Sequence, residues 1–312
     1  MGSNIFRSLG VAAATAVAVL GLTGCGSSAD NTSTGDPDTL VLASIPSENS
    51  GSLQQQYRLV AEVIERETGH KVQFQNATDY AGVIEGQRAG KVQIAGYGPF
   101  SYAMAKDSGV PTTAIAAPVD AADAKPGYVS YAITKAGSPI ASLADFRGKK
   151  VCFVDPSSTS GYLYPSAGLK EAGIDPEKDV TPVFAGGHDA SVLAVLNGQC
   201  DAGFAYDTIV DKTMPDKGQL KPGDVGVIWR SPTIPTSPIA ISTTLSAPLQ
   251  DKLTAIFRDQ LNIPALTAAG RCSGADCALP DGVKYGYVPV QDSLYDGVRQ
   301  VCKVTRAQAC NS

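Results

Sequence analysis

Apolar and polar residues follow one another along this chain in two patterns, one typical of strands and one typical of helices. Short, nearly continuous apolar runs predict buried strands at 39–43, 71–75, 92–97, 113–118, 128–134, 151–154, 181–185, 200–206 and 225–229. Apolar residues three and four positions apart predict helices at 53–69, 79–89, 100–105, 142–146, 162–169, 186–198, 246–261 and 294–304. Strands and helices that take turns in this way are typical of an α/β fold with largely parallel sheets.

The strand–helix alternation occurs twice, which predicts two lobes of the same class. The chain leaves the first lobe near Tyr128 and returns to it near Ile239. We therefore expect residues 39–128 and 240–312 to form the first lobe and residues 129–239 to form the second. Two connecting segments make a hinge, and the cleft between two hinged lobes is a natural ligand site.

A hydroxyl-rich turn at 154–162 lies between a predicted strand and a predicted helix. Its hydroxyl residues are Ser157, Ser158, Thr159 and Ser160. Such a turn gathers free backbone N–H groups, hydroxyl donors and the positive end of the helix dipole. These neutral groups predict a site for a small tetrahedral oxyanion, and an ordinary Ser/Thr helix cap is the alternative. Pro165 either kinks the following helix or begins a second helix after a short first turn.

The composition is that of an ordinary exported or soluble protein with a mildly acidic charge. The chain has 312 residues, which is long enough for two domains, and 43% of them are hydrophobic. The formal net charge is −5 and no run of Lys and Arg occurs, which argues against nucleic acid as a partner. Because the overall field does not attract anions, an anionic ligand would have to be held by local dipoles.

The N-terminal residues are typical of an export signal. Arg7 precedes an apolar run at 11–22 that is too short for a comfortable membrane span. The sequence that ends at Cys25 resembles the bacterial lipobox, in which the Cys becomes lipid-modified and forms the new N-terminus. We therefore expect a signal peptide at 1–24, a flexible tether at 25–38 and a lipid anchor on Cys25. Ordinary signal cleavage beside an incidental Cys is the alternative.

The six remaining cysteines are an even number in an exported chain, which predicts three disulfides. Six cysteines permit many connectivities, so the sequence does not fix the pairing. We expect a disulfide between neighbouring strands of the second lobe, Cys152–Cys200. We expect two further disulfides that close local loops, Cys272–Cys277 and Cys302–Cys310. A zinc site is the alternative, but His70 and His188 are the only histidines and neither falls at ligand spacing. We expect no metal and no cofactor.

Several segments resemble the substrate-binding proteins of phosphonate, phosphite and phosphate ABC transporters. The similar segments are 79–82, 126–128, 155–163, 187–190, 234–235 and 286–290. The hydroxyl turn with the downstream Gly-His pair is the most specific of them. The resemblance implies a two-lobed, type II periplasmic-binding fold, in which each lobe has a mixed, mostly parallel sheet flanked by helices and a two-segment hinge joins the lobes.

The resemblance also implies which residues hold the ligand. The phosphorus oxyanion would be bound by Ser158, Thr159 and Ser160 of the turn and by His188, whose ring can donate an N–H. Two aromatic positions of the cleft correspond to Tyr80 and Tyr128. A hydrogen-bonded loop histidine is the alternative for His188, and core packing is the alternative for the two tyrosines.

One departure from the family bears on the ligand. Members that take aminoalkyl phosphonates place carboxylates in the cleft, and the matching positions here are Thr208 and Ser237. Asp207 lies one residue from the first of these positions and is the candidate acid of the site. The departure favours phosphate, phosphite or a short alkyl phosphonate as the ligand.

These observations favour a monomeric binding lipoprotein on the extracytoplasmic face of the plasma membrane, which passes its ligand to an ABC permease and ATPase. A hydrolase is a second hypothesis, because Ser158, His188 and Asp189 are residue types of nucleophilic catalysis. No G-x-S-x-G motif occurs, however, and we expect no enzyme. A binding protein or sensor for another tetrahedral anion such as sulfate is the third. A protonated phosphorus oxyanion needs an acceptor, which Asp155, Asp189 or Asp207 could supply.

Overall fold

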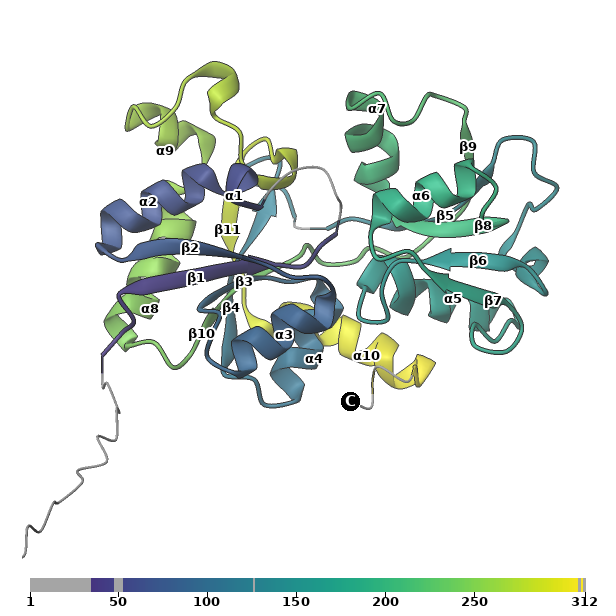
Figure 1. Cartoon of the computed structure of the whole chain (residues 1–312), viewed down its shortest axis with the longest axis horizontal. Helices are drawn as coiled ribbons and strands as arrows, with labels where there is room; N and C mark the ends of the chain where they lie inside the picture. Colours follow the sequence, from purple (N-terminus) through teal and green to yellow (C-terminus); the bar gives the residue numbers. More distant parts are fainter. Residues whose placement is uncertain (1–34, 48–52, 126, 308–309, 311–312) are drawn as a thin grey trace, which may run out of the picture. The chain divides into compact units, whose positions relative to one another are not determined.

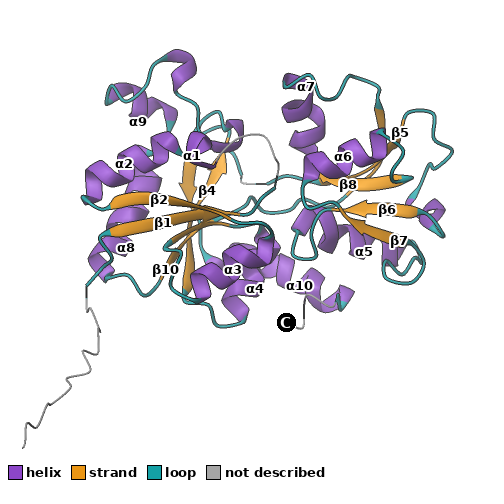
Figure 2. Cartoon of the chain, viewed as in Figure 1, coloured by secondary structure: helices purple, strands orange, loops and turns teal. Residues whose placement is uncertain are grey.

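The structure is a computed structural model that describes residues 35–47, 53–125, 127–307 and 310 (Figure 1). The predicted signal peptide and Cys25 lie outside these residues. Eleven strands of the described chain form two mixed sheets with helices on both faces (Figure 2). None of the described helices is long and apolar enough to cross a membrane.

The first sheet has the order β11-β4-β10-β3-β1-β2. Its strands are β1 (Thr39–Ser44), β2 (Lys71–Asn76), β3 (Ile94–Gly96), β4 (Thr112–Val119), β10 (Ile239–Ser242) and β11 (Gly286–Pro289). β1 pairs in parallel with β2 and β3, whereas β10 enters antiparallel between β3 and β4. β11 pairs antiparallel with β4 at the edge. We call this sheet and the helices packed on it the first lobe.

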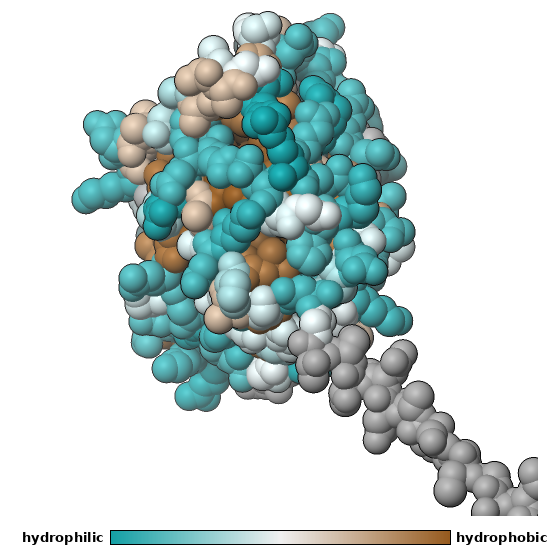
Figure 3. All heavy atoms as spheres, turned by 90° about the vertical axis from the view of Figure 1, so that its left-hand side faces the viewer, coloured by the Kyte–Doolittle hydropathy of each residue, from teal (hydrophilic) through white to brown (hydrophobic). Residues whose placement is uncertain are grey.

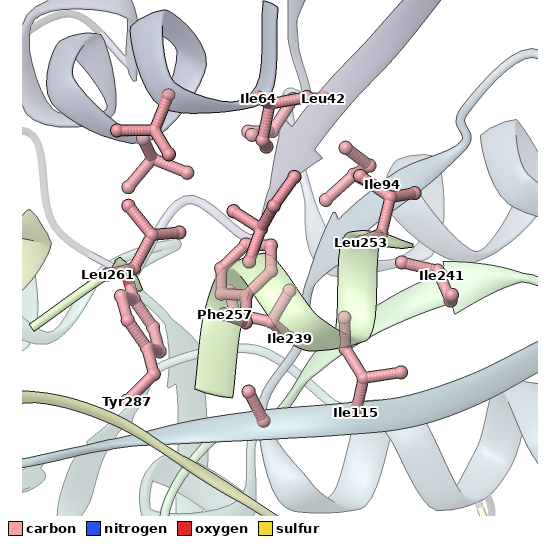
Figure 4. Packing of buried hydrophobic residues seen from close by; sticks show 14 of the residues in the cluster. Leu42, Ile64, Ile94, Ile115, Ile239, Ile241, Leu253, Phe257, Leu261 and Tyr287 are labelled. Carbon is pink, nitrogen blue, oxygen red and sulfur yellow. The ribbon is translucent and has the colours of Figure 1, made fainter. Parts of the chain in front are cut away.

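Helices cover both faces of the first sheet, and successive side chains of a strand point to opposite faces. In β1, Leu40 and Leu42 face one hydrophobic cluster and Ala43 faces another. The first cluster contains residues of α2 (Arg58–Thr68), α8 (Ala247–Ala255) and the following helical turn, among them Ile64, Leu253 and Phe257 (Figure 4). The second cluster contains residues of α3 (Tyr80–Arg88) and α4 (Pro99–Asp107). The outer end of this lobe is mostly hydrophilic (Figure 3).

The second sheet has the order β7-β6-β8-β5-β9, and with its helices we call it the second lobe. Its strands are β5 (Ser130–Lys135), β6 (Lys150–Phe153), β7 (Thr181–Phe184), β8 (Ala202–Tyr206) and β9 (Val225–Arg230). α5 (Tyr164–Glu171) and α6 (His188–Leu196) belong to this lobe, as does the short α7 (Met214–Asp216). β6 pairs in parallel with β7 on one side and with β8 on the other, while β5 runs antiparallel between β8 and β9. The expected α/β architecture with mixed sheets is confirmed.

Two crossover segments join the lobes, one after β4 and one before β10. They pair with each other: Tyr128 N–H donates to Ile234 O at 2.9 Å and Ile234 N–H donates to Tyr128 O at 2.8 Å. Gly127 allows this close approach, because a Cβ there would lie 2.8 Å from Thr233 Cγ2. The C-terminal helix α10 (Asp296–Thr305) contacts α4 of the first lobe and α5 of the second, so it adds a third connection.

Three disulfides are present, and they are the three that the sequence hypothesis names. Cys152–Cys200 has a Cα–Cα distance of 5.8 Å and ties β6 to the turn before β8. Cys272–Cys277 and Cys302–Cys310 close short loops. Cys310 also packs against the hydrophobic cluster of the second lobe. This contact places the end of the described chain on that lobe.

Candidate anion-binding site

A cavity of about 300 Å³ is lined by both lobes and by the two crossovers. The first lobe contributes the carboxyl ends of β1, β3 and β4, where ligand sites of open α/β sheets commonly lie. Six of the seven residues predicted from the sequence line the cavity: Ser158, Thr159, Ser160, His188, Tyr80 and Tyr128. The three hydroxyl residues and His188 are only 1–3% exposed, so they lie on the buried part of the cavity wall.

The hydroxyl turn is held by its own cap and by a glycine. Ser158 Oγ accepts a hydrogen bond from Gly161 N–H at 3.0 Å and caps a π-helical turn over Thr159–Leu163. A Cβ on Gly161 would lie 2.4 Å from Val154 Cβ, so only glycine fits between the turn and the preceding strand. α5 then begins at Tyr164, directly after the π-helical turn, with Pro165 in its first turn. The structure thus has the second of the two arrangements considered for Pro165.

Thr159 and Ser160 take part in a network that reaches the first lobe. Thr159 Oγ1 accepts the N–H of Phe100, at the start of α4, at 2.8 Å. The Tyr128 hydroxyl is hydrogen-bonded to the side chains of Ser160 and Thr159. Burial raises the pKa of Tyr128 above its usual value, so its hydroxyl keeps its proton and can donate. Tyr128 therefore lines the cavity and also packs against a buried cluster, and its contact with a ligand stays a prediction.

His188 is a neutral hydrogen-bond donor. Burial lowers its pKa to about 3, so the imidazole is uncharged near neutral pH. Its Nδ1 accepts the backbone N–H of Tyr206 at 3.2 Å. A neutral imidazole carries one proton, which must then be on Nε2, and Nε2–H is left as the donor of the ring. Donation of this N–H to a ligand oxygen stays a prediction.

Three helices of the described chain begin at the cavity: α3 at Tyr80, α4 at Pro99 and α6 at His188. Helix N-termini carry unpaired N–H groups and partial positive charge, which favour an anion. Some of these N–H groups are bonded across the lobes, because Tyr80 N–H donates to Asp155 Oδ2 at 3.5 Å and His188 N–H donates to Ser47 O at 2.8 Å. The two lobes are therefore in direct contact around the site.

Asp207 is not among the residues that line the cavity, and its role as the acid of the site stays a prediction. Its carboxylate oxygens accept the N–H groups of Thr208, at 2.9 Å, and Val129, at 3.3 Å. These bonds hold the acid against the first crossover, and the neighbouring Thr208 lines the cavity in its place. Asp155 is bound in a similar way, by Ser157 N–H at 2.7 Å and by Tyr80 N–H. Burial raises the pKa of both carboxyls.

Several lining residues were not identified from the sequence as part of the site. Tyr57 lies between α1 (Leu53–Gln56) and α2, packs in the first hydrophobic cluster and also lines the cavity. Tyr206 ends β8, and its ring meets the His188 ring edge-on at 4.7 Å. The position of Tyr206 at the carboxyl end of a strand is a signal that could have identified it. Asp120 and Lys125 of the first crossover also line the cavity.

Two α/β lobes joined by paired crossovers, with a cavity between them, are typical of the class of periplasmic ligand-binding proteins. The family described as "ABC transporter, phosphonate, periplasmic substrate-binding protein" matches residues 42–264 of this chain. The chain belongs to this family. It is the substrate-binding component of an ABC importer of the phosphonate, phosphate and phosphite type, it acts outside the cytoplasm, and its family is one of binding proteins and not of enzymes.

Comparisons with individual proteins agree with this assignment. The "Phosphate-import protein PhnD" of Mycolicibacterium smegmatis is 46% identical over 308 residues, which is 96% of each chain. The "Phosphonates-binding periplasmic protein" of Escherichia coli is 34% identical over 227 residues, covering 70% of this chain and 65% of that protein. A solved binding component of an ABC phosphonate transporter from Pseudomonas aeruginosa superposes with a TM-score of 0.72 at 28% identity, covering 87% of both chains.

Proposed function

We propose that this protein captures a small phosphorus oxyanion, namely phosphate, phosphite or a short alkyl phosphonate, and delivers it to its permease. The observation that carries the proposal is the pairing of the turn 158–160 with the neutral donor His188 in one buried cavity. Ser158, Thr159, Ser160 and His188 donate to the ligand oxygens in this proposal. A buried anion needs many such bonds, because its desolvation is costly. The name of the M. smegmatis relative supports phosphate among the three ligands.

The proposal includes closure of two lobes over the ligand, with residues 39–128 and 240–312 in the first and 129–239 in the second. The paired crossovers at Tyr128 and Ile234 would act as the hinge. Support comes from the hydrogen bonds that cross between the lobes beside the site, including Phe100 N–H to Thr159 Oγ1. Closure of this kind removes the bound anion from water and makes its hydrogen bonds stronger.

Ligands without an ammonium tail should bind best. Thr208 and Ser237 line the cavity, and hydroxyls replace the water around a buried ammonium poorly compared with a paired carboxylate. We expect phosphate, phosphite or methylphosphonate to bind at least roughly tenfold more tightly than 2-aminoethylphosphonate, as measured by calorimetric titration. A thermal-shift panel that also contains sulfate gives a first ranking, because the tightest ligand stabilises the folded state most.

The reverse order of affinities would contradict this prediction and would require a carboxylate near the ligand tail. Asp120 is the acid that lines the cavity, so Asp120→Asn is the variant that would then lose 2-aminoethylphosphonate binding. Stronger binding of sulfate than of any phosphorus oxyanion would replace the proposed ligand class altogether.

The lipid anchor is a separate proposal: Cys25 is lipid-modified and holds the protein on the outer face of the plasma membrane. Its support is the lipobox-like sequence that ends at Cys25 and the polar segment that follows. Cells that express Cys25→Ser should release the protein into the soluble fraction, whereas wild-type protein should fractionate with the membrane. Identical distributions of the two proteins would contradict the anchor and leave the binding site unaffected.

A further inference from the structure

The site described above has a kinetic difficulty, because its ligand and the protein carry charge of the same sign. The formal net charge of the chain is −5. The donors in the cavity are hydroxyls, backbone N–H groups and the neutral His188, which act only over hydrogen-bonding distances. An approaching phosphate dianion therefore meets a repulsive overall field before it reaches any of them.

Lys125 is the one cationic side chain on the described cavity wall. It lies on the first crossover, its side chain is exposed, and it forms no ion pair with any other described residue. Asp120, five residues earlier on the same crossover, is the only acid on the described wall, and its Oδ1 accepts Lys284 N–H at 2.9 Å. The cavity wall thus has one charge of each sign, both on the crossover.

We propose that Lys125 attracts the anion into the cavity and speeds its entry, without holding the bound anion. This inference rests on the proposed capture of a phosphorus oxyanion. An exposed ammonium acts through water, so it contributes little to a bound state that buried donors already satisfy. Its attraction nevertheless reaches an approaching dianion over about 10–30 Å, depending on the salt concentration, and so it acts on the encounter. Asp120 opposes the same encounter.

The test measures the association and dissociation rate constants of inorganic phosphate, by stopped-flow competition with a fluorescent phosphate sensor. Lys125→Gln should lower the association rate constant about threefold at roughly 10 mM ionic strength and hardly at all near 1 M. Lys125→Glu should lower it about tenfold, since it reverses the charge. Asp120→Asn should raise it about threefold, and the Asn carbonyl can still accept Lys284 N–H. The dissociation rate constant should stay unchanged in all three variants.

Lys91→Gln is the matched control, because Lys91 is exposed, does not line the cavity and carries the same charge. An equal effect of Lys91→Gln and Lys125→Gln would overturn the inference, since net charge alone would then explain the rates. A faster dissociation in Lys125→Gln would also overturn it, because Lys125 would then hold the bound anion. If wild-type protein binds phosphate with an entry rate that does not depend on Lys125, only this inference fails. If it binds no phosphorus oxyanion, the proposed function fails with it.

Discussion

Thr159→Val is expected to weaken the binding of phosphate by about tenfold to a hundredfold. Valine keeps the shape of threonine and removes the hydroxyl, which accepts Phe100 N–H at 2.8 Å and is hydrogen-bonded to Tyr128. A hydrogen bond to a charged group contributes roughly 1.5–3 kcal/mol, and that range corresponds to the expected loss. The change also leaves Phe100 N–H without its partner across the lobes, so the closed arrangement is weakened as well.

Calorimetric titration of phosphate measures this effect, and Thr159→Ser is its matched control. Serine retains the hydroxyl and should bind within a few-fold of wild type, whereas the valine variant should not. His188→Gln extends the test to the other side of the site. Unchanged affinity in both Thr159→Val and His188→Gln would mean that the ligand binds elsewhere and that the turn is only a helix cap.

The elements that could be predicted from the sequence are those whose pattern is local. Leu40 and Leu42 alternate with their neighbours in β1, and the helix α2 ends at Gly69, whose φ of 80° suits glycine. β11 was not predicted as a strand, because its four residues include Gly286 and Pro289 and its pairing with β4 is a tertiary contact. The helical segment after β8, at Ile209–Thr213 and Met214–Asp216, was not predicted either, because Pro215 interrupts its apolar pattern.

In the candidate site too, the residues of a local motif could be predicted, whereas residues placed by distant contacts could not. Ser158, Thr159 and Ser160 are contiguous, so the motif and its helix-start chemistry could be recognised together. The position of Asp207 depends on Val129, 78 residues away, whose N–H its carboxylate accepts. No local pattern contains that bond, and the sequence proposes Asp207 for the site because it lies one residue from a position where members that take aminoalkyl phosphonates place a carboxylate. Lys125 was missed because a lone exposed lysine in a loop has no periodicity to mark it.

The free energy of unfolding is expected to fall steeply in acid because of His188. Its pKa is about 3 in the folded protein, against about 6.5 for an unperturbed histidine. Between these two values the unfolded chain binds one more proton than the folded chain, so stability is lost as the pH decreases from about 6.5 toward 3. The full difference corresponds to about 4–5 kcal/mol, and roughly 2–3 kcal/mol of it should be lost between pH 7 and pH 4.5.

Guanidinium unfolding at pH 7.0, 5.5 and 4.5 measures this loss, and the comparison with His188→Gln isolates it. Glutamine does not titrate, so the variant should lose about 2–3 kcal/mol less than wild type over this range, whatever its stability at neutral pH. Asp155 and Asp207, whose pKa values are raised by burial and by partial burial respectively, act in the opposite direction, but they are present in both proteins. His70→Gln is the matched control, because His70 is the only other histidine of the chain and is half-buried, away from the cavity. If the free energy of unfolding falls equally with pH in wild type and in His188→Gln, His188 is not held neutral in the folded protein. The Nε2–H donor assigned to the anion site would then lose its basis.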